Sequence, residues 1–263
     1  MTVIREPAVA GSFYPGNAPE LGRTVEFLLE EAKCGDVGAP KALIAPHAGY
    51  IYSGAVAAAA YARLRPYRDQ YERVILLGPC HRVPVRGFAL SSADVFRTPI
   101  GDVPLDTQAI AGMDIPLVEV FDDTHIYEHS LEVHLPFLQS VLGSFSLVPI
   151  VVGNTTPECV AEVLDALWGG PETLIVISSD LSHYLSYDQA RAVDGETRRA
   201  IEDLDVRGID HDTACGATPI GGLLITAKRR GMRVNTLDLC NSGDTAGDRR
   251  NVVGYGSWVF VEQ

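Results

Sequence analysis

Short apolar runs recur along this chain of 263 residues, and polar turns and helical patterns separate them. The runs are apolar at nearly every position, which is typical of strands buried on both faces of a parallel sheet. Strands that alternate with helices predict an α/β fold, with a mainly parallel central sheet and helices on both faces. The predicted buried strands are 41–46, 73–77, 146–152 and 173–177.

Helical patterns fill most of the intervals between these runs. Asn17 is suited to cap a helix over 18–33, and Thr156 is suited to start one that ends near Trp168. Two short segments, 88–91 and 95–98, are interpreted as a strand hairpin. The other predicted helices are 54–64, 107–111, a segment from Ser130 limited by Pro136, 188–204 and 218–230, and the other strands are 233–239 and 252–261.

Composition limits the class of protein. The length suits one α/β domain over residues 1–263, and 46% hydrophobic with 21% charged residues is typical of a globular chain. The net charge of -13 argues against nucleic acid or a membrane surface as a partner, because both attract basic patches. No apolar run reaches the ~18 residues of a membrane span, and we see no secretory signal. Five cysteines without a CxxC pair favour a reducing cytoplasm over a disulfide framework.

Polar residues follow three of the buried runs at the point where each predicted strand ends. His47 follows the first run, His81 follows the second, and Asp180 and His183 follow the last. A single histidine in such a place is more often a hydrogen-bonded structural residue than a ligand. Parallel strands, however, bring their carboxyl ends to one edge of a sheet, so we expect these side chains to share a crevice.

Two histidines and one further ligand are enough for an open metal site. A carboxylate as the third ligand favours non-haem iron and oxygen chemistry, whereas a cysteine favours zinc or copper. Spacing alone leaves the third ligand open. The candidates are Asp180, Glu128, Glu132 and Cys215.

The densest group of histidines supplies candidates for supporting roles. Glu128 with His129, and Glu132 with His134, are predicted to orient metal-bound histidines, to contact substrate or to act as acid and base. A surface helix with mixed charges explains Glu132 equally well.

Two further residue groups have a chemical interpretation and a structural one. Cys215 precedes a predicted helix, whose N-terminus would favour the thiolate form, although a small buried cysteine is the ordinary alternative. Asp180 and His183 are spaced as a base and its orienting carboxylate, or as parts of a polar turn.

A series of longer blocks extends from REPAVAGSFYPG near the N-terminus to VVGYGSW near the C-terminus. The blocks between them are APHAGYIYSG (45–54), LLGPCHRVP (76–84), RTP (97–99), EHSLEVHLPFLQ (128–139), PIVVG (149–153), SSDLSH (178–183), CGATPIGGLL (215–224) and NSGD (241–244). In content and order this series resembles the Memo family, which is also called protein B of the AmmeMemoRadiSam system. The resemblance covers essentially the whole chain.

The resemblance implies an α/β fold similar to that of class III extradiol dioxygenases, which are non-haem iron enzymes. It implies that the metal-site residues are His47, His81 and Cys215. It also implies that Asp180 and His183 line the same pocket, with His183 in the place of the catalytic base. A cysteine ligand is softer than the dioxygenase carboxylate and can be oxidised, so ring cleavage does not transfer with the fold.

These implications favour a metal-dependent oxidoreductase that holds Fe(II), or alternatively copper, and acts on a small-molecule substrate. The family likeness also implies radical-SAM and AMMECR-type protein partners. The alternative is a non-catalytic protein that sequesters metal or binds peptides as an adaptor, and a zinc hydrolase is a third candidate. One departure from the family pattern is Cys80, which replaces the usual serine beside His81 and is expected to alter the redox behaviour of the site.

Overall fold

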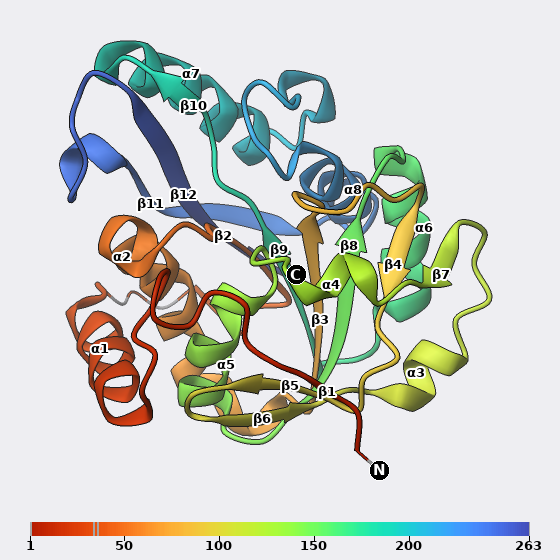
Figure 1. Cartoon of the computed structure of the whole chain (residues 1–263). Helices are drawn as coiled ribbons and strands as arrows, with labels where there is room; N and C mark the ends of the chain where they lie inside the picture. The colour runs from red at the N-terminus through yellow and green to blue at the C-terminus, as the bar shows by residue number, and fades with distance from the viewer. Residues whose placement is uncertain (1, 34, 36, 263) are drawn as a thin grey trace.

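A nine-stranded sheet forms the centre of the molecule (Figure 1), for which a computed structural model describes residues 2–33, 35 and 37–262. In spatial order its strands are β10 (His183–Leu185), β12 (Val252–Val261), β2 (Ala42–Ala45), β9 (Thr173–Ser178), β3 (Arg73–Pro79), β8 (Ser146–Val152), β4 (Phe88–Leu90) and β7 (Val118–Val120), and β11 (Arg233–Asn241) also pairs with β12.

The sheet is mixed, with a parallel centre. β2, β9, β3 and β8 lie side by side in this order and run parallel to one another. β12 pairs antiparallel with β2 on one side, and β4 pairs antiparallel with β8 on the other. The predicted parallel core is therefore confirmed, and antiparallel strands extend it at both ends.

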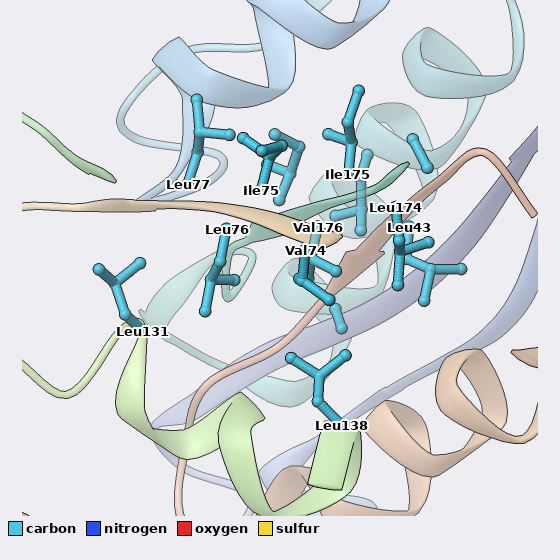
Figure 2. Close-up of a cluster of buried hydrophobic side chains, with 14 of the residues drawn as sticks. Leu43, Val74, Ile75, Leu76, Leu77, Leu131, Leu138, Leu174, Ile175 and Val176 are labelled. Atoms are coloured by element: carbon cyan, nitrogen blue, oxygen red, sulfur yellow. The ribbon is translucent and has the colours of Figure 1, made fainter. Parts of the chain in front are cut away.

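Every residue of β2 and β9 is buried, and so is β3 after its first residue. Figure 2 shows why these strands are apolar at successive positions: Ile75 and Leu77 point to one face of the sheet, and Val74 and Leu76 point to the other. A strand covered on both faces needs apolar side chains in both directions.

Helices cover both faces of the sheet (Figure 1). On one face α6 and α8 pack together, and α8 contacts β3 and β9. On the other face lie α2 and α5, and α1 packs against both of them. Separately, α7 packs on β11 and β12. The helices are α1 (Ala18–Glu31), α2 (Tyr50–Tyr61), α3 (Thr107–Ala111), α4 (Asp123–Ile126), α5 (Leu135–Leu142), α6 (Pro157–Leu167), α7 (Tyr187–Glu202) and α8 (Ala217–Arg229), with 3-10 turns η1 (Ala62–Gln70), η2 (Glu132–His134), η3 (Val206–Gly208) and η4 (Ser242–Asp244).

The predicted hairpin over 88–98 is wrong. β4 joins the large sheet, whereas the next strand belongs to a separate three-stranded sheet that also holds the N-terminal segment. The amides of Asp94 and Val95 donate to the Val3 carbonyl, and the N-terminal strand pairs parallel with residues 95–96, while residues 101–104 form the antiparallel partner of 95–98. The strands of this sheet are β1 (Ile4–Arg5), β5 (Val95–Thr98) and β6 (Gly101–Pro104).

Two helices begin at other residues than the sequence pattern predicts. α2 begins at Tyr50, four residues before the predicted start, since the amides of Tyr52 and Ser53 already donate to the Gly49 carbonyl. Pro136 lies in the first turn of α5, where a missing amide hydrogen costs no helical bond. It therefore helps to begin that helix after the turn η2. Among the described residues, no helix has the length and apolar character needed to cross a membrane.

Candidate metal centre

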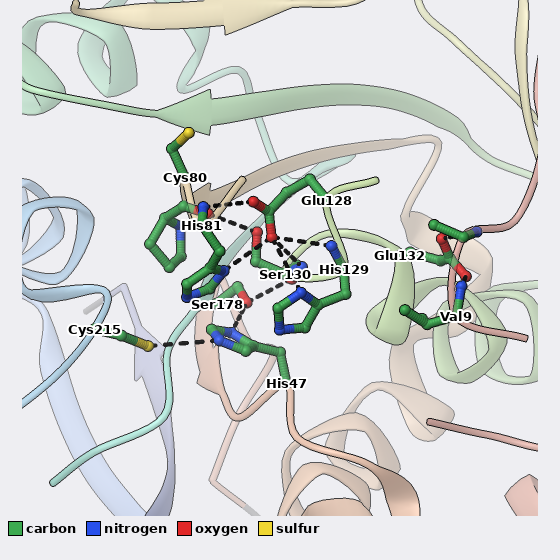
Figure 3. A network of polar contacts seen from close by, with 12 residues as sticks. Val9, His47, Cys80, His81, Glu128, His129, Ser130, Glu132, Ser178 and Cys215 are labelled. Carbon is green, nitrogen blue, oxygen red and sulfur yellow. Dashed lines mark hydrogen bonds and ion pairs between the residues drawn. The ribbon is translucent and has the colours of Figure 1, made fainter. Parts of the chain in front are cut away.

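The carboxyl ends of β2, β3 and β9 meet at one edge of the sheet, as predicted. His47 follows β2, His81 follows β3, and Ser178 ends β9. The His47 and His81 rings lie 5.1 Å apart between centroids, and the His129 ring lies 5.5 Å from the first and 4.8 Å from the second. One potential ligand atom from each of the three histidines falls within 4.8 Å of the other two. Figure 3 shows the three imidazoles gathered at this point.

A buried chain of hydrogen bonds fixes the orientation of His47. Its Nδ1 lies 2.6 Å from Ser178 Oγ, and that hydroxyl donates to the Ser130 carbonyl at 2.6 Å. Because the hydroxyl has only one hydrogen, His47 Nδ1 must donate to it. His134 Nε2 lies 2.8 Å from the same oxygen and must donate as well, so its Nδ1 accepts the Tyr61 hydroxyl at 2.7 Å. All of these groups are satisfied by a single set of tautomers.

That set leaves Nε2 of His47 without a proton. Burial lowers the pKa of His47 well below its usual value, and charge on His81 and His129 lowers it further. Burial also lowers the pKa of His134 to about 3. Both rings are therefore neutral at pH 7, and His47 presents a free nitrogen lone pair at the cluster.

Glu128 performs the equivalent function for His81. Its carboxylate accepts the His81 amide at 2.6 Å and lies 2.9 Å from His81 Nδ1. Burial raises the pKa of Glu128, but hydrogen bonds from His81 and Ser130 outweigh it, and the net pKa is about 2. An ionised Glu128 can only accept, so His81 Nδ1 carries a proton, and in the neutral imidazole Nε2 is then the free nitrogen. A carboxylate that orients an imidazole in this way is common around protein metal ions.

Cys215 lies beside His47, with 3.5 Å between its Sγ and His47 Nε2. Burial raises the pKa of the Cys215 thiol to about 12, and the Asp180 charge contributes in the same direction. The predicted thiolate is therefore not stable by itself: desolvation outweighs the nearby N-terminus of α8. A metal ion would have to replace the thiol proton.

The spacing of Cys215 and His47 fits two ligands of one ion, whereas the mutually close group of ligand atoms among the described residues is His47, His81 and His129. An ion at ~2.1 Å from nitrogen and ~2.3 Å from sulfur, with a tetrahedral angle, separates the two ligands by about 3.6 Å. The observed separation of Cys215 Sγ and His47 Nε2 is 3.5 Å. His129 is the competing third ligand: its Nδ1 is buried without a hydrogen-bond partner among the described residues, 3.4 Å from Glu128 Oε1.

Nearly the whole sequence matches a known family. A sequence model described as Memo-like protein covers residues 5–259. The chain belongs to the Memo family. A MEMO1 family protein of Methanosarcina acetivorans is 37% identical and one of Aquifex aeolicus is 36% identical, each over 98% of this chain and 99% of the relative. A MEMO1 family protein of Metallosphaera sedula is 34% identical over the same shares.

In this Memo-family chain, Asp180 and His183 do not form the predicted hydrogen-bonded pair. Asp180 Oδ1 accepts the His47 amide at 2.8 Å, and its Oδ2 lies 4.0 Å from His47 Nε2. Burial raises the pKa of Asp180 to about 6 despite this bond. His183 lies on β10 with an exposed side chain, and no hydrogen bond joins it to Asp180 in the described part of the chain. Its role as a base remains a prediction.

Two other predicted residues lie outside the cluster. Glu132 is fully buried, so it is not part of a charged surface, and it pairs with Arg5 and accepts the Val9 amide at 3.0 Å. Figure 3 shows it away from the histidines. Cys80 points its sulfur away from the cluster, where the thiol donates to the Val83 carbonyl at 2.7 Å.

The sequence did not single out Ser178, Ser130 or Tyr61. Ser178 follows four apolar positions of β9, which indicates a strand end but not a partner for histidine. His129 was assigned a supporting role, although the structure places it within the cluster. Its position in the histidine-rich segment beside Glu128 was the available signal.

Proposed function

We propose that this Memo-family protein binds one Fe(II) ion through His47, His81 and Cys215 and is a metal-dependent oxidoreductase for a small organic substrate. The observation that supports the proposal best is that His47 and His81 each have Nδ1 held by an acceptor and Nε2 free. Preorganised imidazoles of this kind lower the cost of metal binding. We include in this proposal that the fold is similar to that of class III extradiol dioxygenases.

The choice of Cys215 as the third ligand rests on its 3.5 Å separation from His47 Nε2. A thiol with a pKa of about 12 is protonated at neutral pH, so metal binding must release that proton. His129 is the nearest alternative, since its ligand atom lies within 4.8 Å of those of His47 and His81.

A bound Fe(II) ion would supply redox chemistry and an open position for oxygen or substrate. The residues of the chain would bind and orient the substrate and move protons. His183 suits a proton acceptor because partial desolvation of its ring lowers its pKa, which favours the neutral form. Asp180, with a pKa of about 6, would steady the loop of His47 through its amide.

Anaerobic purification, metal analysis and oxygen uptake with catechol-type substrates test the proposal together. We expect one iron per chain, loss of that iron in His47→Ala and Cys215→Ala, and oxygen uptake that depends on substrate. A folded protein that takes up no metal under reducing conditions would rule out the metal centre. Radical-SAM and AMMECR-type partners are tested separately, by copurification.

A non-catalytic role in metal sequestration is the second candidate, and the Cys215 thiol favours it. Soft sulfur ligands select Cu(I), and two imidazoles with a thiolate suit copper as well as iron. Tight copper binding without oxygen uptake would support sequestration instead of the oxidoreductase. A peptide-binding adaptor would bind peptide equally well after metal removal.

A further inference from the structure

A cavity of about 530 Å³ opens directly beside the candidate metal centre, with His81 and Cys215 in its wall. Its wall also contains the polar side chains of Arg82, Asn154 and His211. Clefts of ~300–1,000 Å³ next to reactive groups are the usual places for small-molecule ligands. The cavity is therefore the natural position for a substrate of the proposed enzyme.

The charge of this cavity is opposite to that of the chain. The protein has 34 acidic residues against 21 lysines and arginines, yet none of the described residues that line the cavity is acidic. Arg82, which lines the cavity, carries a permanent positive charge. A cavity lined by a positive charge and by no carboxylate attracts anionic ligands, even in a protein whose net charge is negative.

Arg82 is available for a ligand. Within the described ranges (2–33, 35 and 37–262), its guanidinium has no hydrogen bond or ion pair, whereas Arg73 and Arg97 each bind a carboxylate. The side-chain amide of Asn154 likewise has no partner there. His211 is occupied in part, with Nε2 3.1 Å from Thr218 Oγ1.

We propose that this cavity binds a small organic monocarboxylate, with Arg82 as the residue that recognises the carboxylate. A guanidinium can hold a carboxylate through two parallel hydrogen bonds, and Asn154 can donate to it as well. Val85 and Val152 give the cavity apolar wall for the body of the molecule. One arginine and one neutral amide match a single negative charge, whereas phosphate groups are usually held by several cations.

The inference rests on the proposed function, because that function makes the cavity a substrate site. The test uses metal-free protein, so that the carboxylate cannot bind through a metal ion. Benzoate is the probe, and its neutral amide benzamide and phenyl phosphate are the comparisons, with binding followed by ligand-detected NMR titration. We expect benzoate to bind more tightly than either comparison molecule.

Arg82→Gln should weaken benzoate binding about tenfold or more, and Arg82→Lys should weaken it less, because lysine keeps the charge without the planar fork. Arg233→Gln is the matched control. It removes the same charge from an exposed arginine that has no ion pair with any described residue, at the opposite end of the sheet, where Arg233 pairs with Val261.

Equal binding of benzamide, tighter binding of phenyl phosphate, or equal losses in Arg82→Gln and Arg233→Gln would each overturn the inference. Circular dichroism of each variant excludes misfolding as the cause of a loss. Failure of the metal-centre proposal is distinguishable, because it would appear as lost metal binding in protein that still binds benzoate.

Discussion

His47 Nδ1 and Ser178 Oγ are joined by a hydrogen bond of 2.6 Å in which the histidine donates. The direction follows from the hydroxyl, whose single hydrogen goes to the Ser130 carbonyl. The bond therefore decides which nitrogen of His47 is free, and the free one is Nε2, beside Cys215. The residue that ends β9 thus determines the chemistry of a residue that follows β2.

Ser178→Ala should reduce metal affinity about 10- to 100-fold, because His47 loses the acceptor that holds its tautomer and orientation. The change also leaves His134 Nε2 and the Ser130 carbonyl without this partner, which should cost about 1–3 kcal/mol of stability. Metal titration and chemical unfolding measure the two effects.

Ser257→Ala is the matched control for this change. Ser257 is as fully buried as Ser178, but its hydroxyl has no hydrogen-bond partner in the part of the chain that the structure describes. Its removal should leave metal affinity unchanged and stability equal or slightly higher. If both variants lose the same metal affinity, the hydrogen-bond chain does not orient His47.

Two buried carboxylates on neighbouring turns should respond differently to replacement by glutamine. Glu128→Gln should lower metal affinity about 10- to 100-fold, since His81 loses a charged acceptor. Glu132→Gln should leave metal affinity intact but cost about 3–5 kcal/mol of stability, because Arg5 stays buried without its counter-charge. A reversed pattern would show that Glu132, not Glu128, supports the site.

The sequence predicted the parallel core and the meeting of His47 with His81, because apolar runs and strand ends follow from local pattern. It could not predict that β5 pairs with the N-terminal segment, since alternation indicates a strand without naming its partner. The role of Ser178 was hidden for a similar reason. A serine after an apolar run gives no signal of a histidine that lies 131 positions away.

Cys215→Ala and His129→Ala should separate the two candidates for the third ligand. We expect Cys215→Ala to lose most of the bound metal and His129→Ala to lose much less, because Cys215 Sγ lies 3.5 Å from His47 Nε2, a separation that suits two ligands of one ion. Proton release on metal binding provides a second measurement. A thiol with a pKa of about 12 is protonated near pH 7 and must release its proton when it binds the metal, and this release should disappear in Cys215→Ala. The opposite order of metal loss would assign the third position to His129.

Asp194 should make stability depend on pH. It is buried on α7, and burial raises its pKa to about 6, although the Ser182 amide donates to it at 3.1 Å. The unfolded value is about 3.9. The folded protein therefore binds the proton more tightly, so this contribution to stability is complete below pH ~4 and is lost as the pH rises to about 6.

Asp194→Asn stays neutral at every pH and can still accept the Ser182 amide. The variant should therefore gain stability over the wild type as the pH rises from 4 to 6, by about 1–3 kcal/mol, and the gain should stay constant above that range. Urea unfolding at each pH gives the difference, in which the titration of all other groups cancels. Asp69→Asn is the control, because that side chain is 96% exposed and the change should give no such step. A difference between wild type and Asp194→Asn that does not vary with pH would mean that Asp194 is solvated enough to ionise normally in the folded protein.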